Sequence, residues 1–284
     1  MWETLAGVLQ STVLRAGSML RGHFESKHQV AYKTPVDLVT EMDRAVEALF
    51  VRTIRRRFPT HEILSEEMVE GSGGNPWERL PERGRVRWII DPLDGTTNYA
   101  HRVPHCAVSA GLVYRGVIRL GAVYHPWRRE LYFACRGKGA WNNQARMHVS
   151  QVRRLSQALL VTAGFPHEKR LGRELPMAPF RALARHCQAI RRTGSAALDL
   201  ADVACGRYDG FWDLAIKPWD VAAGALLIQE AGGRITNFNG RGPDLFAGDF
   251  IASNGRLQAS LSDFLAAWAP ERRPARTAGG RHQR

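Results

Sequence analysis

Two aspartates follow a short apolar run in the segment RWIIDPLDGTTNYAH, residues 87–101. Asp91 closes the apolar run, and Asp94 lies three residues later on a Gly-Thr turn. Carboxylate oxygens are ligands that Mg²⁺ prefers in proteins. If Thr96 opens a helix, the N–H groups of Gly95 and Thr96 point outward, as they do where a helix start holds a phosphate. The stretch therefore offers ligands for a hard cation beside a site for an anion.

The same residues also have a purely structural interpretation. Asp94 and Thr96 fit an Asx turn followed by a helix cap, which requires no ligand. We favour a functional site because a buried strand would hold Asp91 rigidly, and because Asn98 lies nearby.

Three further carboxylates are candidates, and each has a structural alternative. Glu66 follows an apolar segment in ILSEEM, but paired glutamates usually form a solvated face. Asp220 falls in the first turn of a predicted helix, where an acidic side chain stabilises the helix by ~0.3–1 kcal/mol. Asp43 completes a capping box with Thr40. Taken one at a time, each is more typical of structure than of catalysis.

Covalent catalysis has little support in the sequence. Haloacid-dehalogenase-type phosphatases use a nucleophilic aspartate in a D-x-D-G-T pattern. Here the two aspartates are three residues apart rather than two, and Pro92 occupies the place that the nucleophile would need. The chain has no G-x-S-x-G motif and no cysteine in an obvious anion-binding loop. The remaining chemistry is hydrolysis by a water molecule that a metal ion activates.

The first half of the chain is predicted to contain two helices and an antiparallel meander. Apolar residues recur at helical spacing over residues 2–20 and again over 40–58. A surface loop is expected at 70–84, followed by a buried strand at 86–91. Alternating residues in 106–126 predict a hairpin with its turn at Arg115-Gly116, and 130–141 continues the sheet.

After residue 150 strands and helices alternate, which favours helices layered over a sheet. The predicted strands are 158–164, 188–193, 207–213, 234–238 and 249–254, and the predicted helices are 178–187, 194–206, 218–233 and 255–268.

The composition is typical of one soluble globular domain of residues 1–268, with halves 1–148 and 149–268 and a disordered basic tail at 269–284. No apolar run is long enough to cross a membrane, and the N-terminus does not resemble a signal peptide. Four cysteines without a CxxC pair suggest the cytoplasm and no zinc site. The net charge of +13 can steer anionic substrates, but a basic solvated surface explains it better than dedicated nucleic-acid binding.

Several stretches, in the same order and at similar spacing, resemble the inositol monophosphatase family, and most closely its bacterial SuhB-type branch. They are DLVTEMD, ILSEE, WIIDPLDGTTNYAH, RRTGSAALDLADVACGRYDGFWD and WDVAAGALLIQEAGG. The resemblance spans roughly residues 5 to 265, nearly the whole chain.

The resemblance implies a role for each matching residue. Mg²⁺ would be bound by Glu66, Asp91, Asp94, Asp220 and the carbonyl of Leu93, and phosphate by Gly95 and Thr96. Thr96 and Asp43 would orient and deprotonate the attacking water. The polyol would contact Gly194, Ser195, Ala196 and Asp213. Asp213 stands where the family commonly has glutamate, which leaves the identity of the polyol open.

The implied fold is an α+β layered sandwich of αβαβα type, in an enzyme that is usually a homodimer. The implied activity is Mg²⁺-dependent hydrolysis of a phosphomonoester, with myo-inositol monophosphate as the best-supported substrate. Fructose 1,6-bisphosphate, related sugar phosphates and histidinol phosphate are alternatives. A different class of function, a binding protein associated with RNA polymerase and the transcription machinery, also remains open.

Overall fold

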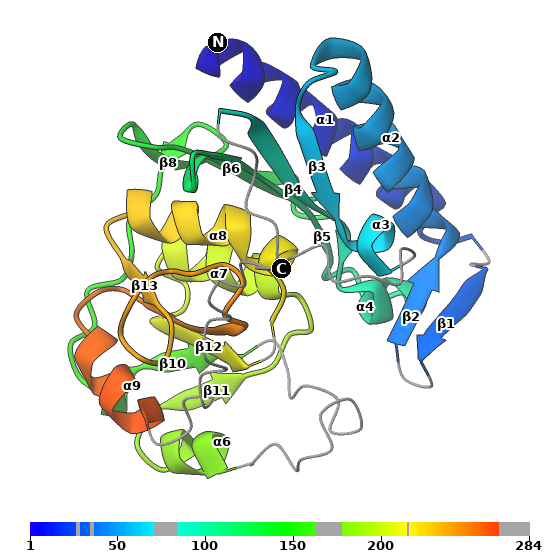
Figure 1. Cartoon of the computed structure of the whole chain (residues 1–284). Coiled ribbons are helices and arrows are strands. Elements are labelled where there is room, and N and C mark those ends of the chain that lie inside the picture. Colours follow the sequence, from blue (N-terminus) through cyan, green and yellow to red (C-terminus); the bar gives the residue numbers. More distant parts are fainter. Residues whose placement is uncertain (27–28, 35–36, 71–83, 163–177, 215, 267–284) are drawn as a thin grey trace, which may run out of the picture.

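The computed structural model describes residues 1–26, 29–34, 37–70, 84–162, 178–214 and 216–266. Their elements form five layers, in the order helix, sheet, helix, sheet, helix (Figure 1). The predicted αβαβα sandwich is therefore confirmed. Most of the predicted loop 70–84 and the whole predicted tail lie outside the described residues. None of the described helices is both long and apolar enough to cross a bilayer.

The larger sheet contains seven strands in the order β3-β4-β5-β6-β7-β8-β9. β3 runs parallel to β4, and every later pair is antiparallel, so the predicted meander is confirmed with β3 added at its edge. The strands are β3 Glu62–Ser65, β4 Val86–Asp94, β5 Ala107–Tyr114, β6 Val117–His125, β7 Glu130–Cys135, β8 Gly139–Asn142 and β9 Ala145–Arg146.

Two long helices, α1 (Trp2–His23) and α2 (Glu41–Arg57), cover one face of this sheet. Their apolar residues recur at helical spacing and pack with Trp88 and Ile90 of β4 in one buried cluster. The opposite side of each helix is polar, and α2 ends in three arginines at 55–57. This amphipathic pattern explains why both helices could be predicted from sequence.

The other face of the sheet is covered by α7 (Ala196–Ala204) and α8 (Pro218–Glu230). Residues on all sides of both helices are buried, because a second sheet lies beyond them. Gly111 of β5 and Gly121 of β6 face α8, where added Cβ atoms would lie 2.9 Å from Ala222 and Ala223. These two glycines let the helix lie directly on the sheet.

The second sheet has five strands in the order β11-β10-β12-β14-β13, with parallel pairing among the first three and antiparallel pairing with β14. Its outer face packs against α6 and α9 in a third apolar cluster. The elements are a 3₁₀ turn at Leu155–Gln157, β10 Leu159–Val161, α6 Ala178–Ala184, β11 Ala189–Arg191, β12 Gly210–Leu214, β13 Arg234–Thr236, β14 Asp249–Ser253 and α9 Gln258–Leu265.

Four short elements gather near one end of the larger sheet, beside the start of α2 (Figure 1). The helix that opens at Thr96 is predicted by the sequence, whereas the β1–β2 hairpin has no clear sequence signal. These elements are β1 Val30–Thr34, β2 Asp37–Thr40, α3 Glu66–Glu70 and α4 Thr96–Ala100.

β4 continues past Asp91, the residue at which the apolar run predicts its end. Asp91 pairs with Ser109, the register then shifts, and Asp94 pairs with Ala107. Pro92 has no N–H to donate, so the ladder is interrupted there and resumes beyond it. Asp91 and Asp94 therefore flank an irregularity within the strand instead of lying beyond its end.

The glycine contact with α8 gives a test of how this helix is positioned. We expect Gly121→Ala to lower the free energy of unfolding by about 1–3 kcal/mol, because the new methyl group meets the α8 backbone. Urea denaturation measures this. Gly7→Ala is the matched control: an added Cβ there meets nothing within 4 Å, and the change should be neutral or stabilising by up to about 1 kcal/mol. Equal stability of Gly121→Ala and wild type would contradict the close approach.

Candidate active site

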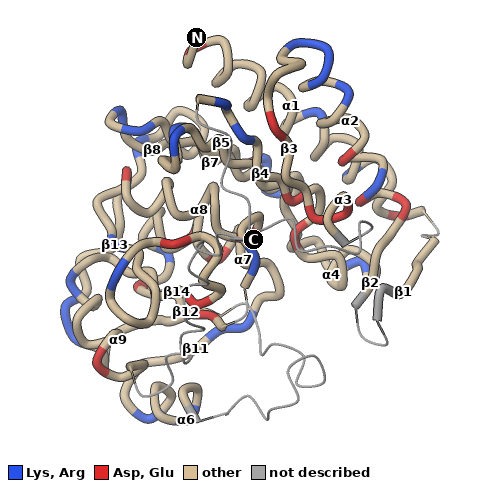
Figure 2. The backbone as a smooth tube through the Cα atoms, viewed as in Figure 1, with Lys and Arg blue, Asp and Glu red and all other residues tan. Residues whose placement is uncertain are grey.

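A cavity of about 190 Å³ opens where β4, α4 and the N-terminal end of α8 meet. All of its lining residues except Leu38 and Thr97 are predicted site residues. The lining comprises Leu38, Glu66, Asp91, Leu93, Asp94, Gly95, Thr96, Thr97, Gly194 and Asp220. Acidic stretches gather around α3 and α4 in the same region (Figure 2).

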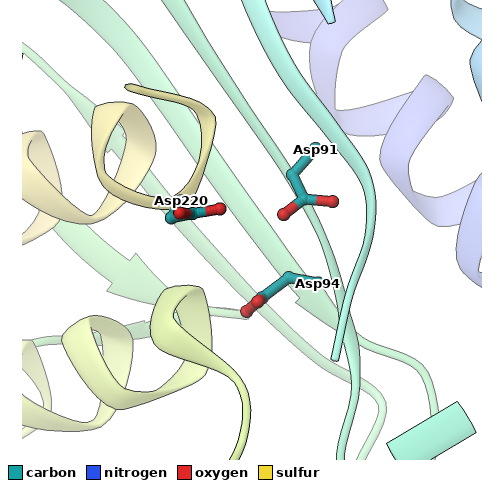
Figure 3. A group of neighbouring side chains, drawn as sticks. All are labelled: Asp91, Asp94 and Asp220. Atoms are coloured by element: carbon teal, nitrogen blue, oxygen red, sulfur yellow. The ribbon is translucent and has the colours of Figure 1, made fainter. Parts of the chain in front are cut away.

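Asp91, Asp94 and Asp220, called here the aspartate group, converge on one side of the cavity (Figure 3). One carboxylate oxygen from each lies within 4.8 Å of the others. Two come from β4 and the third from the first turn of α8, which are separated in sequence by more than a hundred residues. The packing of α8 on the sheet therefore decides whether the group forms.

Each member of the aspartate group has one oxygen held by a backbone N–H. This fixes the carboxylate and leaves its other oxygen for a ligand. The bonds run from Leu93 N to Asp91 Oδ1 (3.0 Å), from Ala197 N to Asp94 Oδ2 (2.8 Å) and from Lys217 N to Asp220 Oδ2 (2.8 Å).

Burial raises the pKa of all three carboxyl groups, and repulsion by neighbouring carboxylates adds to the rise at Asp91 and Asp220. Burial contributes most to the pKa of Asp91, followed by the charge of Glu66 and then those of the other aspartates. Burial raises the pKa of Asp94 to about 6, although hydrogen bonds from Ser195 and the α7 amides oppose it. Burial and the charge of Asp94 raise the pKa of Asp220 to about 7. The ionised group therefore needs a nearby positive charge.

The donor set suits a hard divalent cation. The ligand atoms offered are carboxylate oxygens, with Glu66 and the Leu93 carbonyl also on the cavity wall. Among the described residues, no other group of three acidic, histidine or cysteine side chains is placed to hold a metal ion. Oxygen-only ligands favour ions such as Mg²⁺ over soft metals, which prefer sulfur or imidazole.

Asp43 both caps α2 and reaches the site. One of its oxygens accepts from Thr40 N at 2.8 Å, as the capping box predicted. Its other oxygen, Oδ1, lies 3.0 Å from the Thr96 hydroxyl, whose one proton has Asp43 Oδ1 and the carbonyl of Leu93, also at 3.0 Å, as its two acceptors. Asp43 is buried and does not itself line the cavity, so Thr96 is the group that connects it to the site.

The turn at Gly95 has a conformation that glycine adopts readily. Its φ is 93°, and an added Cβ would lie 3.1 Å from the carbonyl oxygen of His105. The N–H groups that follow belong to the first turn of α4, where no intrahelical acceptor exists. Asn98 secures this turn, because its Nδ2 donates to the carbonyls of His105 (2.8 Å) and Thr193 (2.9 Å).

The residues expected to contact the polyol are placed differently from one another. Gly194 lines the cavity and is exposed. Ser195 and Ala196 are buried at the start of α7 and do not line it. Asp213 is buried in β12, where its Oδ1 accepts from Leu214 N at 2.6 Å, and it too lies outside the cavity wall.

Two lining residues were not singled out from sequence. Leu38 lies in β2, and Thr97 in the first turn of α4. Leu38 lies in the motif DLVTEMD and Thr97 in DGTTNYAH, so their place in these motifs could have identified them as site residues. Their side chains alone could not, because neither is a typical acid, base or metal ligand.

Comparison with known proteins agrees with this geometry. The model of the inositol monophosphatase family matches residues 1–269. The inositol-1-monophosphatase of Synechocystis is 41% identical over 269 residues, covering 93% of this chain and 90% of the relative. The Nus factor SuhB of Pseudomonas aeruginosa is 46% identical over 235 residues, covering 81% and 83%.

A solved structure gives the same result in three dimensions. The extragenic suppressor protein suhB from Bartonella henselae superposes with a TM-score of 0.81 at 36% identity, covering 92% of this chain and 98% of the other. The family is one of metal-dependent phosphatases, and the cavity with its aspartate group lies on the signature motifs. The chain belongs to the inositol monophosphatase family and is a phosphatase.

Proposed function

We propose that the protein is a Mg²⁺-dependent phosphomonoesterase that hydrolyses myo-inositol monophosphate to inositol and inorganic phosphate. The observation that most supports this is the aspartate group beside the Gly95 turn, in one cavity. A relative from Synechocystis is named inositol-1-monophosphatase, which favours that substrate over other phosphomonoesters. We further propose a cytoplasmic homodimer: the family resemblance implies the dimer, and four free cysteines fit a reducing compartment.

The metal ligands in this proposal are Glu66, the aspartate group and the carbonyl of Leu93. Mg²⁺ bound there would lower the pKa of a water molecule and offset the negative charge of the phosphate. The chain's own contribution is to hold the carboxylates ready in a buried, rigid arrangement, through the amide hydrogen bonds described above.

Thr96 and Asp43 are proposed to orient the attacking water and take its proton. The Thr96 hydroxyl donates to Asp43 Oδ1, so the lone pairs of Thr96 Oγ1 can accept a proton from a water in the cavity. Asp43 can then receive the hydroxyl proton on Oδ1, because the two donors from Thr40 occupy its other oxygen and leave Oδ1 to Thr96.

The substrate is proposed to bind through two neighbouring segments. The N–H groups of Gly95 and Thr96 would hold phosphate oxygens, while the segment from Gly194 to Ala196 and Asp213 would bind the polyol. Gly194 faces the cavity directly, which supports its assignment. Asp213 is one methylene shorter than the glutamate common in the family and does not line the cavity, so related sugar phosphates are alternative substrates.

Phosphate release from myo-inositol 1-phosphate tests the proposal directly. We expect release in Mg²⁺ and none in EDTA, and we expect Asp91→Asn to reduce it by about three orders of magnitude, since the metal supplies several kcal/mol of transition-state stabilisation. Asp209→Asn is the control: this buried aspartate, like Asp91, accepts from a backbone amide, and it accepts from a serine hydroxyl as well. It lies just before β12, outside the cavity, and its variant should stay active.

Fructose 1,6-bisphosphate and histidinol phosphate are run alongside to identify the preferred substrate. Release from either at a higher kcat/KM than from the inositol phosphate would replace the substrate assignment. If folded protein released phosphate from none of the three substrates, the proposed phosphomonoesterase activity would be contradicted.

The pH dependence of metal activation follows from the raised pKa values. Protons compete with the cation for Asp94, whose pKa is about 6, and Asp220, whose pKa is about 7. Both groups are ionised at pH 8 and increasingly protonated below pH 7. We therefore expect the Mg²⁺ concentration for half-maximal activity to rise at least about tenfold between pH 8 and pH 6. A constant requirement over this range would mean that these carboxylates do not bind the activating ion.

A second function is supported by the identity of 46% to a Nus factor SuhB. Under this alternative the chain acts by association with the transcription machinery, and the exposed arginines that end α2 (Figure 2) are available for an acidic partner. The two functions are separated by introducing wild type or Asp91→Asn into a strain from which the gene for this protein has been deleted. If the phosphatase activity is required, Asp91→Asn should fail to restore growth; full restoration by the inactive variant would favour the binding function.

A further inference from the structure

The side chain of Ser195 is completely buried and directed at a member of the aspartate group. Its hydroxyl donates to Asp94 Oδ2 at 2.5 Å. The N–H of Ala197 donates to the same oxygen at 2.8 Å. With two donors on Oδ2, the oxygen of Asp94 that remains for a ligand is Oδ1.

Asp94 differs from its two partners in where its donors come from. Asp91 and Asp220 accept from amides two and three residues away, so their orientation is set locally. The donors to Asp94 lie 101 and 103 residues further along the chain. Its orientation therefore depends on α7 being held against β4.

The segment before α7 is held on both sides. Asn98, on the α4 side, donates to Thr193 O at 2.9 Å, and an added Cβ on Gly194 would lie 3.0 Å from the Asn98 amide. The hydroxyl of Thr193 donates to Asp199 within α7 at 2.6 Å. Ser195 is thus fixed between the phosphate turn and the helix.

Both capacities of the Ser195 hydroxyl are used inside the protein. It donates to Asp94, and as the N-cap of α7 it accepts from Leu198 N at 3.4 Å. Because Ser195 does not line the cavity, its side chain has no route to a substrate there. Hydrogen bonds donated to a metal-binding carboxylate orient that carboxylate, and their loss typically weakens metal binding by about ten- to a hundredfold.

We propose that Ser195 is a positioning residue, which orients the carboxylate of Asp94 for metal binding, and that its side chain does not contact the substrate. The inference rests on the proposed metal-dependent function and refines the role of the Gly194–Ala196 segment within it. The backbone of that segment remains available to the polyol.

Mn²⁺ binding to the metal-free protein tests the proposal without turnover. The binding is measured from the EPR signal of free Mn²⁺ and by calorimetry. We expect Ser195→Ala to weaken Mn²⁺ binding by about ten- to a hundredfold. Ser253→Ala is the matched control, because Ser253 is equally buried and donates to Gln258 at 2.7 Å, in β14. That variant should lose stability but bind Mn²⁺ as the wild type does.

The kinetic behaviour separates positioning from substrate contact. For Ser195→Ala we expect raised Mg²⁺ to restore most of the rate, with a KM for the phosphomonoester within about twofold of wild type. We also expect Ser195→Thr, which keeps the hydroxyl, to recover the Mn²⁺ affinity.

Three results would overturn the assignment. They are unchanged Mn²⁺ affinity in Ser195→Ala, a raised KM that Mg²⁺ does not correct, and a Ser195→Thr protein with wild-type Tm that binds Mn²⁺ as weakly as Ser195→Ala. If the wild type itself bound no Mn²⁺, the proposed metal-dependent function would fail first, so the two failures are distinguishable.

Discussion

Three aspartates that repel one another, two of them buried and Asp220 half-buried, are the feature on which the site depends. Their ligand oxygens lie within 4.8 Å of each other, and burial alone would favour the neutral acids. Backbone amides and Ser195 stabilise the ionised forms only in part, since the pKa of Asp94 and of Asp220 still lies well above that of an exposed aspartate. Such a group is stable as a set of carboxylates when a cation joins it, and this requirement links the fold to metal chemistry.

The five layers bring these carboxylates together from distant parts of the chain. β4 carries Asp91 and Asp94 on either side of a shift in its pairing with β5. α8, which packs directly on the glycines of β5 and β6, carries Asp220. The start of α7 supplies donors to Asp94, and α2 supplies Asp43 through Thr96. The helix layer with α2, the larger sheet and the central helices thus all contribute residues to one site. Disturbing the packing between these layers should therefore alter the chemistry as well as the stability.

Much of this could be predicted from sequence because the signals are local. The period of apolar residues gave α1 and α2, alternation gave the meander, and the capping box placed Asp43 at the start of α2. The spacing of DPLDGTT pointed to cation and phosphate chemistry in one turn. Three features could not be predicted this way. The β1–β2 hairpin is too short for a clear period, the continuation of β4 to Asp94 depends on pairing with β5, and the bond from Ser195 to Asp94 joins residues 101 positions apart.

Anomalous diffraction from crystals grown with Mn²⁺ and inorganic phosphate tests the central claim most directly. The account predicts anomalous peaks within coordination distance of Asp91, Asp94 and Asp220, with a phosphate between them and the amides of Gly95 and Thr96. An aspartate group without a peak, in a crystal where Mn²⁺ is bound elsewhere or where phosphate occupies a different surface, would contradict it.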